Sequence, residues 1–210
     1  MARDGTATRT RILDAAQTLV IARGFSATTV DEIIASAHTT KGAFFNHFPT
    51  KQHLARTLVE RYAAEDAEVL TSLLARSERL SDDPLQQLLL FLGLLADVAE
   101  EGMRTAPGCL LASFCYEREL VDQATQDLIA GALRRWGHTI RGKLEQIADR
   151  YPPRLPVDLD AIADQAATTI EGSYVMVRAL ADATFVRGQL DQLRAYLSLL
   201  FAGEMRSAPG

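Results

Sequence analysis

The polar side chains between Thr40 and Lys51 have the types and spacing needed to bind nucleic acid. Lysine and asparagine side chains, here Lys41 and Asn46, form hydrogen-bond pairs with guanine and adenine edges in the major groove. Lys51 falls in the first turn of a following helix, where free backbone N–H groups help to bind a phosphate. This combination indicates contact with double-stranded DNA.

The elements that must position these side chains begin at Thr29. Thr29 and Glu32 have the spacing of a capping box, which marks the start of a helix. Val30, Ile33 and Ala37 then fall on one face of that helix. The pattern predicts a short helix that buries one face and ends before His38.

A second short helix is predicted from about Thr40 to His47. Phe44 and Phe48 lie four residues apart and are expected to pack into a small core behind it. Gly42 is unfavourable inside a helix by about 1 kcal/mol, and glycine is tolerated where another surface must approach. Pro49 ends the segment. Two short helices at a tight turn have the layout of a helix-turn-helix, whose second helix enters the major groove.

Residues 9–54 resemble the DNA-binding domain of the TetR family of transcriptional regulators. The residues that match are Ile12-Leu13-Asp14-Ala15-Ala16, Gly24-Phe25, Thr28-Thr29-Val30, Ile33, Ala37, Lys41-Gly42, Phe45, His47-Phe48-Pro49, Lys51 and Leu54. Two positions depart from the family pattern. His38 stands where the family has glycine in the turn, so a positive φ is expected at a histidine. Phe45 stands where the family has a tyrosine whose hydroxyl binds a phosphate. Phenylalanine has no hydroxyl, so only an apolar contact with DNA is expected from it.

The resemblance implies a set of DNA-binding residues in and around the second short helix. They are Thr29, Thr39, Thr40, Lys41, Gly42, Ala43, Phe45, Asn46, His47 and Lys51. Within this set, Thr29, His47 and Lys51 are the phosphate candidates. The base-edge candidates are Thr40, Lys41, Ala43 and Asn46.

The resemblance also implies an all-α fold with two domains. Residues 1–54 are expected to form a three-helix DNA-binding domain, and residues 55–210 a helical ligand-binding and dimerisation domain. The expected protein is a homodimeric regulator, usually a repressor, that binds a palindromic operator and responds to a small-molecule effector. A protein of this kind needs no cofactor.

Composition and charge agree with an all-helical, DNA-binding protein. The 210 residues are 48% hydrophobic, and no segment alternates apolar and polar residues as a strand does. The net charge is −5, but residues 1–56 carry +3 and residues 57–210 carry −8. This asymmetry indicates one DNA-facing end.

Other features point to a cytoplasmic protein that is not bound to a membrane. There is no N-terminal charged-then-apolar signal. The most apolar run, Leu88 to Leu95, is far shorter than the ~20 residues of a membrane-spanning helix. The two cysteines, Cys109 and Cys115, do not form the framework of a secreted disulfide protein.

Periodicity and helix-breaking residues divide the rest of the chain into helices. We expect a loose arm over residues 1–8 and a first helix that ends at Gly24 and buries Phe25. The arm, with Arg3, Arg9 and Arg11 in and after it, is either a solvated tail or a contact to phosphate or the minor groove. Asp83 and Pro84 form a helix start. Further helices are predicted at about 51–79, 85–101, 109–119, 122–151, 158–181 and 188–204.

The last two helices carry an apolar seam. Leu190, Leu193, Leu197 and Leu200 are spaced 3, 4 and 3 residues apart, and the facing candidates are Ala166, Ile170 and Val177. This seam predicts a four-helix bundle formed with a second copy of the chain. The alternative is that the same face packs inside one subunit.

An effector site is expected in the C-terminal domain. The candidate lining residues are Leu92, Met103, Cys109, Phe114, Trp136, His138 and Tyr174. Apolar side chains predominate in this set, which favours an apolar or aromatic ligand. Each of these residues can also be explained as core packing. Cys109 follows Gly108 at a predicted helix start, where a thiolate would be stabilised.

Catalytic and metal-binding sites are not expected. The four histidines have no metal-ligand spacing with one another or with the cysteines. Glu100, Glu101, Glu117 and Glu119 read as solvated faces. The alternative functions are an all-helical small-molecule-binding protein that does not touch DNA, or a thiol-based sensor of oxidants or electrophiles.

Overall fold

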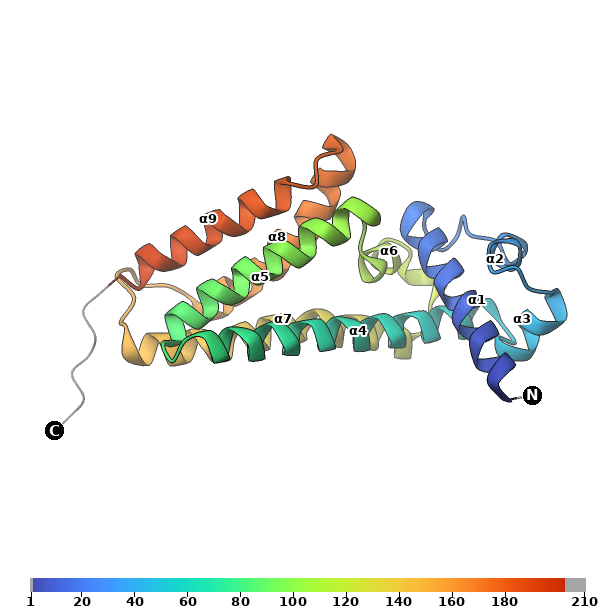
Figure 1. Ribbon diagram of the computed structural model, residues 1–210, viewed down its shortest axis with the longest axis horizontal. Coiled ribbons are helices and arrows are strands. Elements are labelled where there is room, and N and C mark those ends of the chain that lie inside the picture. Colours follow the sequence, from blue (N-terminus) through green and yellow to red (C-terminus); the bar gives the residue numbers. More distant parts are fainter. Residues whose placement is uncertain (1, 203–210) are drawn as a thin grey trace. The chain divides into compact units, whose positions relative to one another are not determined.

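The computed structural model describes residues 2–202, with side chains from residue 5. Within this range the chain forms helices joined by turns and has no strand (Figure 1), which confirms the all-α prediction. None of the helices in this range combines the length and apolar character needed to span a membrane.

The chain divides into two compact units. Unit 1 contains the chain up to Glu65 together with Ala106–Gly131, and unit 2 contains Asp66–Thr105 and the chain from Ala132 onward. Two of the boundaries fall inside helices, in α4 (Lys51–Leu80) and in α7 (Gln123–Arg150). The expected division between residues 54 and 55 likewise falls inside a helix, the one predicted at about 51–79.

Unit 1 is organised around α1 (Ala2–Arg23), which packs against α2 (Val30–Ser36), α3 (Lys41–His47) and α6 (Leu110–Cys115). In Figure 1 these helices run from blue at α1 to yellow-green at α6. A short 3-10 helix, η1 (Arg118–Leu120), follows α6. The buried side chains of this unit include Ile12, Ala16, Phe25, Ile33, Phe44, Phe48, Leu54, Leu58 and Phe114.

The N-terminal segment differs from the expected loose arm because α1 is helical from Ala2. Its first turns lie against the end of α3, since a Cβ placed on Gly5 would be 3.8 Å from His47 Cε1. Tertiary packing therefore extends the helix beyond the region that its own apolar periodicity marks. Residue 1 lies outside the described range.

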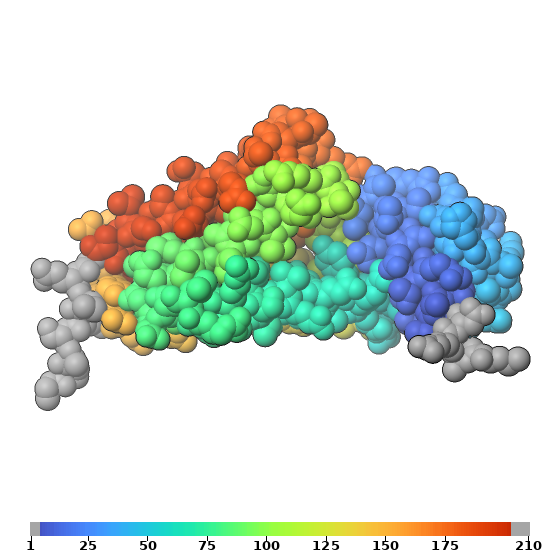
Figure 2. Space-filling view, viewed as in Figure 1, coloured from blue at the N-terminus to red at the C-terminus, as the bar shows by residue number. Residues whose placement is uncertain are grey.

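Unit 2 is built from α5 (Pro84–Thr105), α8 (Leu159–Leu180), α9 (Phe185–Leu200) and parts of α4 and α7. Helix α9 packs against both α5 and α8. In Figure 2, α5 in green and α9 in orange-red lie side by side on the visible face. Their facing side chains belong to one apolar core that includes Leu88, Phe91, Leu92, Leu95, Leu190, Leu193, Leu197 and Leu200.

Several helix boundaries differ from the predictions. α5 continues to Thr105 rather than ending near Glu101. α6 is shorter than expected, because Cys109 is its N-cap and the chain turns after Cys115. α9 begins at Phe185, before the expected Gly188.

Candidate nucleic-acid interface

The start of α2 is set by the predicted capping box. The Glu32 backbone N–H donates to the Thr29 hydroxyl oxygen at 3.3 Å, and the Thr29 backbone N–H donates to the Glu32 carboxylate at 2.9 Å. The Thr29 hydroxyl also donates to this carboxylate, and these bonds lower the pKa of Glu32. Thr29 is exposed, and its hydroxyl is already hydrogen-bonded as the N-cap of α2. These bonds fix the position at which α2 begins.

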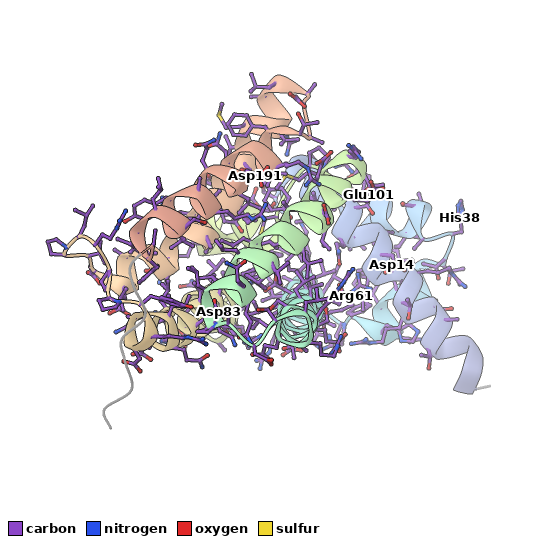
Figure 3. All side chains as sticks on the ribbon, turned by 60° about the vertical axis from the view of Figure 1, so that its left-hand side comes forward. Asp14, His38, Arg61, Asp83, Glu101 and Asp191 are labelled. Carbon is purple, nitrogen blue, oxygen red and sulfur yellow. The ribbon has the colours of Figure 1, made fainter. Side chains whose placement is uncertain are left out.

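The turn between α2 and α3 depends on the backbone of His38. Its φ is 49°, the left-handed region expected where a histidine replaces a turn glycine. The imidazole is exposed and points away from the helices of its unit (Figure 3). Since α2 ends at Ser36 and α3 begins at Lys41, His38 lies in the short turn between them.

Helix α3 is supported from behind by two phenylalanines. Phe44 and Phe48 are both fully buried, with ring centroids 5.9 Å apart. Thr40 is the N-cap of α3, and its hydroxyl oxygen accepts from the Ala43 backbone N–H at 3.2 Å. The core predicted behind this helix is confirmed.

The other face of α3 is open to solvent. Lys41, Gly42, Phe45 and Asn46 are exposed, while Ala43 and His47 are half-buried. Thr39 is half-buried in the preceding turn. The light-blue surface of this segment is visible in the space-filling view (Figure 2). The ten residues expected to bind DNA thus lie in and around a single short helix, mostly on its outer side.

Lysine 51 has an internal partner that its sequence position does not reveal. Its Nζ donates to the Phe25 carbonyl oxygen at 2.6 Å and lies 4.3 Å from the centroid of the Phe25 ring. Burial lowers the pKa of Lys51, against the opposing influence of Glu117 and Glu32. Lys51 therefore ties the start of α4 to the loop before α2, and its contact with phosphate stays a prediction.

Glu117 is a structural residue that the sequence analysis missed. It was expected to be solvated, yet its carboxylate accepts from the Ser26 backbone N–H at 2.9 Å and from the Ser26 hydroxyl at 2.6 Å. Gly24, with φ of 90°, leaves room for it, because a Cβ there would lie 2.7 Å from Glu117 Oε1. Ser26 and Glu117 are 91 positions apart, so no local sequence pattern predicts this contact.

The same unit carries a second long-range link between helices. The Arg61 guanidinium on α4 donates to Asp14 at 2.6 Å and to Gln17 at 2.7 Å, both on α1. Asp14 and Arg61 are labelled in Figure 3. These bonds fix the first helix against the one that follows the helix-turn-helix.

The candidate effector residues are distributed between the two units. Cys109 and Phe114 belong to unit 1, where the Phe114 ring packs 5.1 Å from that of Phe25. Cys109 is buried, and its sulfur accepts from the Ala112 N–H at 3.5 Å.

The other five candidates belong to unit 2. Leu92 and Met103 are buried in its apolar core, Trp136 and Tyr174 pack against that core, and His138 is exposed. The structure gives the four core residues a packing role.

Trp136 has a polar partner that the sequence analysis did not single out. Its indole N–H donates to Asp66 Oδ2 at 2.7 Å, and its ring lies 6.2 Å from Phe91. Burial raises the pKa of Asp66, while the bond from Trp136 and the charge of Arg135 act in the opposite direction. Asp66 is a polar group among the apolar side chains of unit 2.

Most residues of the predicted dimerisation seam lie inside unit 2. Ala166, Val177, Leu190, Leu193, Leu197 and Leu200 are all buried in its core, and Ile170 packs against that core. These side chains therefore pack within one subunit, which is the alternative to the predicted seam between two copies of the chain. The exposed apolar residues of the same two helices are Val175, Met176, Leu180, Tyr196 and Leu199.

Comparisons with known proteins agree with this architecture. Residues 12–58 match the family described as bacterial regulatory proteins, tetR family. The chain is 23% identical over 173 residues to the transcriptional repressor DhaR of Mycobacterium sp. (strain GP1), which covers 82% of this chain and 83% of that protein.

Two solved structures of TetR-family regulators have the same fold. The regulator from Chloroflexus aurantiacus aligns over 98% of this chain and all of its own, with a TM-score of 0.76 and 25% identity. The regulator from Agrobacterium tumefaciens aligns over 91% of this chain and 98% of its own, with a TM-score of 0.76 and 24% identity. From the helix-turn-helix, the overall fold and these likenesses together, we conclude that the chain belongs to the TetR family of bacterial transcriptional regulators.

Proposed function

We propose that this regulator binds a palindromic operator as a homodimer and is released by a small apolar or aromatic ligand. The observation that supports this most directly is the two-sided character of α3. Phe44 and Phe48 hold one face in the core, while Lys41 and Asn46 extend from the other into solvent. A helix of this kind has both the rigid support and the donors that major-groove reading needs.

In this proposal Lys41 and Asn46 read base edges. Lysine donates to guanine O6 and N7, and asparagine pairs with adenine N6 and N7. Thr40 and Ala43 complete the base-facing set, and Gly42 allows close approach of the backbone. Phe45 provides apolar contact, for instance to a thymine methyl group. Thr29, Thr39, His47 and Lys51 are assigned to the sugar-phosphate backbone.

The proposed dimer uses the outer faces of α8 and α9. Val175, Leu180 and Leu199 have 58%, 55% and 67% of their surfaces exposed, although all three are large apolar residues. Exposed apolar side chains grouped on two neighbouring helices favour an interface. A two-fold dimer would present two copies of α3 to half-sites about 34–36 Å apart along the DNA.

Release by ligand follows from this spacing. DNA accepts two reading heads only at separations set by its helical repeat, so a small change in their separation weakens both sets of contacts. We place the effector in unit 2, where Trp136 and Asp66 add polar groups to an apolar core. A ligand that binds one separation better than the other would act by shifting the population of states. As a regulator of chromosomal DNA, the protein would act in the cytoplasm.

The test is selection from a random duplex library with the purified chain, followed by affinity measurements on the selected sequence. We expect a palindromic consensus and binding that weakens as salt rises. Lys41→Ala should relax the preference at the base pairs that Lys41 contacts. The loss of binding free energy should be about 1–3 kcal/mol for each contact removed. Arg79→Ala, an exposed cation of unit 2, is the matched control and should leave the consensus unchanged.

The competing function is an all-helical small-molecule-binding protein that does not touch DNA. Absence of any enriched sequence, with no salt-sensitive binding, would favour this second function. An unchanged consensus for Lys41→Ala would instead remove Lys41 from the base-reading set while leaving DNA binding intact.

A further inference from the structure

Arg9 is a cation of unit 1 with an unusual environment. Its guanidinium carbon lies 5.5 Å from the centroid of the Phe48 ring, and the side chain is exposed. Phe48 is the C-cap of α3, so the charge is held beside the end of the proposed reading helix. A cation over an aromatic face is held in place at a small cost in side-chain freedom.

In the part of the chain with described side chains, no carboxylate pairs with Arg9. Four other cations of unit 1 form ion pairs: Arg23 with Glu32, Lys41 with Asp31, Arg56 with Glu60, and Arg61 with Asp14. Among residues whose side chains are described, no ion pair involves Arg9. The ammonium of Lys51 also donates one hydrogen bond to the carbonyl oxygen of Phe25. Arg9 therefore adds a positive charge on the first helix, beside the C-terminal end of α3.

Arg9 lies beside the C-terminal end of the helix that is proposed to enter the major groove. The groove is about 12 Å wide, so groups flanking an inserted helix meet the phosphates on its edges. Gly5, one turn before Arg9, lies beside His47 at the end of α3, and His47 is itself a phosphate candidate. Arg9 and His47 thus flank the same end of the helix. A guanidinium there has the planar donor geometry that binds phosphate oxygens in pairs.

We propose that Arg9, held over the Phe48 ring, is a phosphate-binding residue of the DNA site and anchors the sugar-phosphate backbone beside the C-terminal end of α3. This inference rests on the proposed DNA-binding function and adds α1 to the DNA-binding surface. It assigns to Arg9 a contact that fixes orientation and carries no sequence information.

Arg11 provides a matched control on the same helix. It lies two residues further on, about 200° around the helix axis at 3.6 residues per turn. It is also exposed, and its guanidinium donates to the Thr8 hydroxyl at 3.1 Å. Arg9→Met and Arg11→Met remove the same charge and keep an apolar stem, so they differ only in the face of α1 that they alter.

The experiment measures affinity for the selected operator and for an unrelated duplex between 50 and 200 mM salt. Each phosphate contact contributes about 0.9 to the slope of log affinity against log salt. Arg9→Met should make the slope shallower by about 0.9 per bound subunit on both duplexes. Over a fourfold rise in salt, the ratio of wild-type to variant affinity should fall by roughly 3.5-fold per bound subunit, or about 12-fold for a bound dimer. The selected consensus and the slope of Arg11→Met should stay as in the wild type.

Two further controls separate the possible failures. Arg9→Lys keeps the charge, so its slope should stay near that of the wild type while its affinity falls through loss of the planar donor pair. Thermal unfolding of each variant shows that it is folded.

An unchanged slope for Arg9→Met, or an equal loss for Arg11→Met, would overturn the assignment of Arg9. A wild-type protein with no salt-sensitive, sequence-selective binding would instead refute the proposed function itself.

Discussion

At the scale of single residues, the turn of the helix-turn-helix depends on one backbone conformation. His38 has φ of 49°, and the left-handed region costs an L-residue roughly 1–2 kcal/mol. Its side chain is exposed, so contacts do not offset this cost. The strain remains because Ile33 and Ala37 on one side, and Phe44 on the other, are fixed in the core.

Replacement of His38 by glycine should stabilise the protein. Glycine adopts positive φ without steric cost, although it loses more chain entropy on folding. We expect His38→Gly to raise the free energy of unfolding by about 0.5–1 kcal/mol, as a difference of these two effects. Denaturant unfolding measures the change. A β-branched residue has a stiffer side chain, so His38→Val should destabilise the protein. Equal stabilities for the two variants would contradict this account of the turn.

Asp66 predicts a pH dependence within unit 2. Burial raises its pKa above the ordinary value of 3.8. A carboxyl group whose folded pKa is raised contributes stability below its unfolded pKa, and this contribution is lost as pH rises through the folded pKa. At pH 7 the ionised carboxylate is therefore unfavourable for folding.

Asp66→Asn should thus gain stability relative to the wild type as the pH rises from about 3.5 to 7. The amide oxygen keeps an acceptor for the Trp136 indole. Denaturant unfolding across this range gives the difference, with exposed Asp149→Asn as the control. A difference that shrinks with rising pH would have the wrong sign for a carboxyl group with a raised pKa.

At the scale of elements, α6 and the turn after it hold the helix-turn-helix in place. Glu117 accepts two hydrogen bonds from Ser26, and Phe114 packs on Phe25. Gly108 approaches α1 so closely that a Cβ there would lie 2.7 Å from Ile21 Cγ2. A segment that follows α5 in the chain is thus integrated with the loop that leads into α2.

Removal of the Glu117 carboxylate should loosen this loop. Two hydrogen bonds at about 0.5–1.5 kcal/mol each imply a loss of roughly 1–3 kcal/mol in unfolding free energy for Glu117→Ala. Exposed Glu119→Ala, two residues away, should change stability little. Amide hydrogen exchange should also show faster exchange at the Ser26 N–H in the Glu117 variant alone. Matching effects of the two variants would mean that the bonds to Ser26 contribute nothing measurable.

At the scale of the whole molecule, assembly depends on which face of α8 and α9 a partner covers. Leu197 is buried in the core and Leu199, two residues further on, is exposed. Residues two positions apart on a helix differ by about 200° around its axis, so these two leucines lie on nearly opposite faces of α9. Helices α4 and α7 run without interruption through both units, so two of the chain connections between the units are helical.

Leu199→Glu should therefore convert the proposed dimer to monomers while leaving the subunit folded. Sedimentation velocity measures the change in mass, and operator affinity should fall because the two half-sites no longer bind as a unit. Leu197→Ala should instead lower the unfolding free energy by about 2–5 kcal/mol through a core cavity. A dimer that survives Leu199→Glu would place the interface elsewhere.

The sequence alone determined the local features, because each depends on residues within a few positions of one another. The capping box at Thr29, the positive φ at His38, the Gly24 helix end and the helix start at Asp83 and Pro84 follow from backbone chemistry and short side-chain reach. The fold class and the exposed reading face followed from periodicity and the family resemblance.

Only the tertiary structure decided which neighbour covers each apolar face and where distant polar groups meet. The leucine spacing of α9 specified a buried face, but that face packs on α5 and α8 within the chain. The partners of Lys51, Glu117 and Trp136 lie 26, 91 and 70 residues away. Helical periodicity predicts that one face of a helix is buried, but it does not identify the element that covers this face. The reason is that the hydrophobic effect is non-directional.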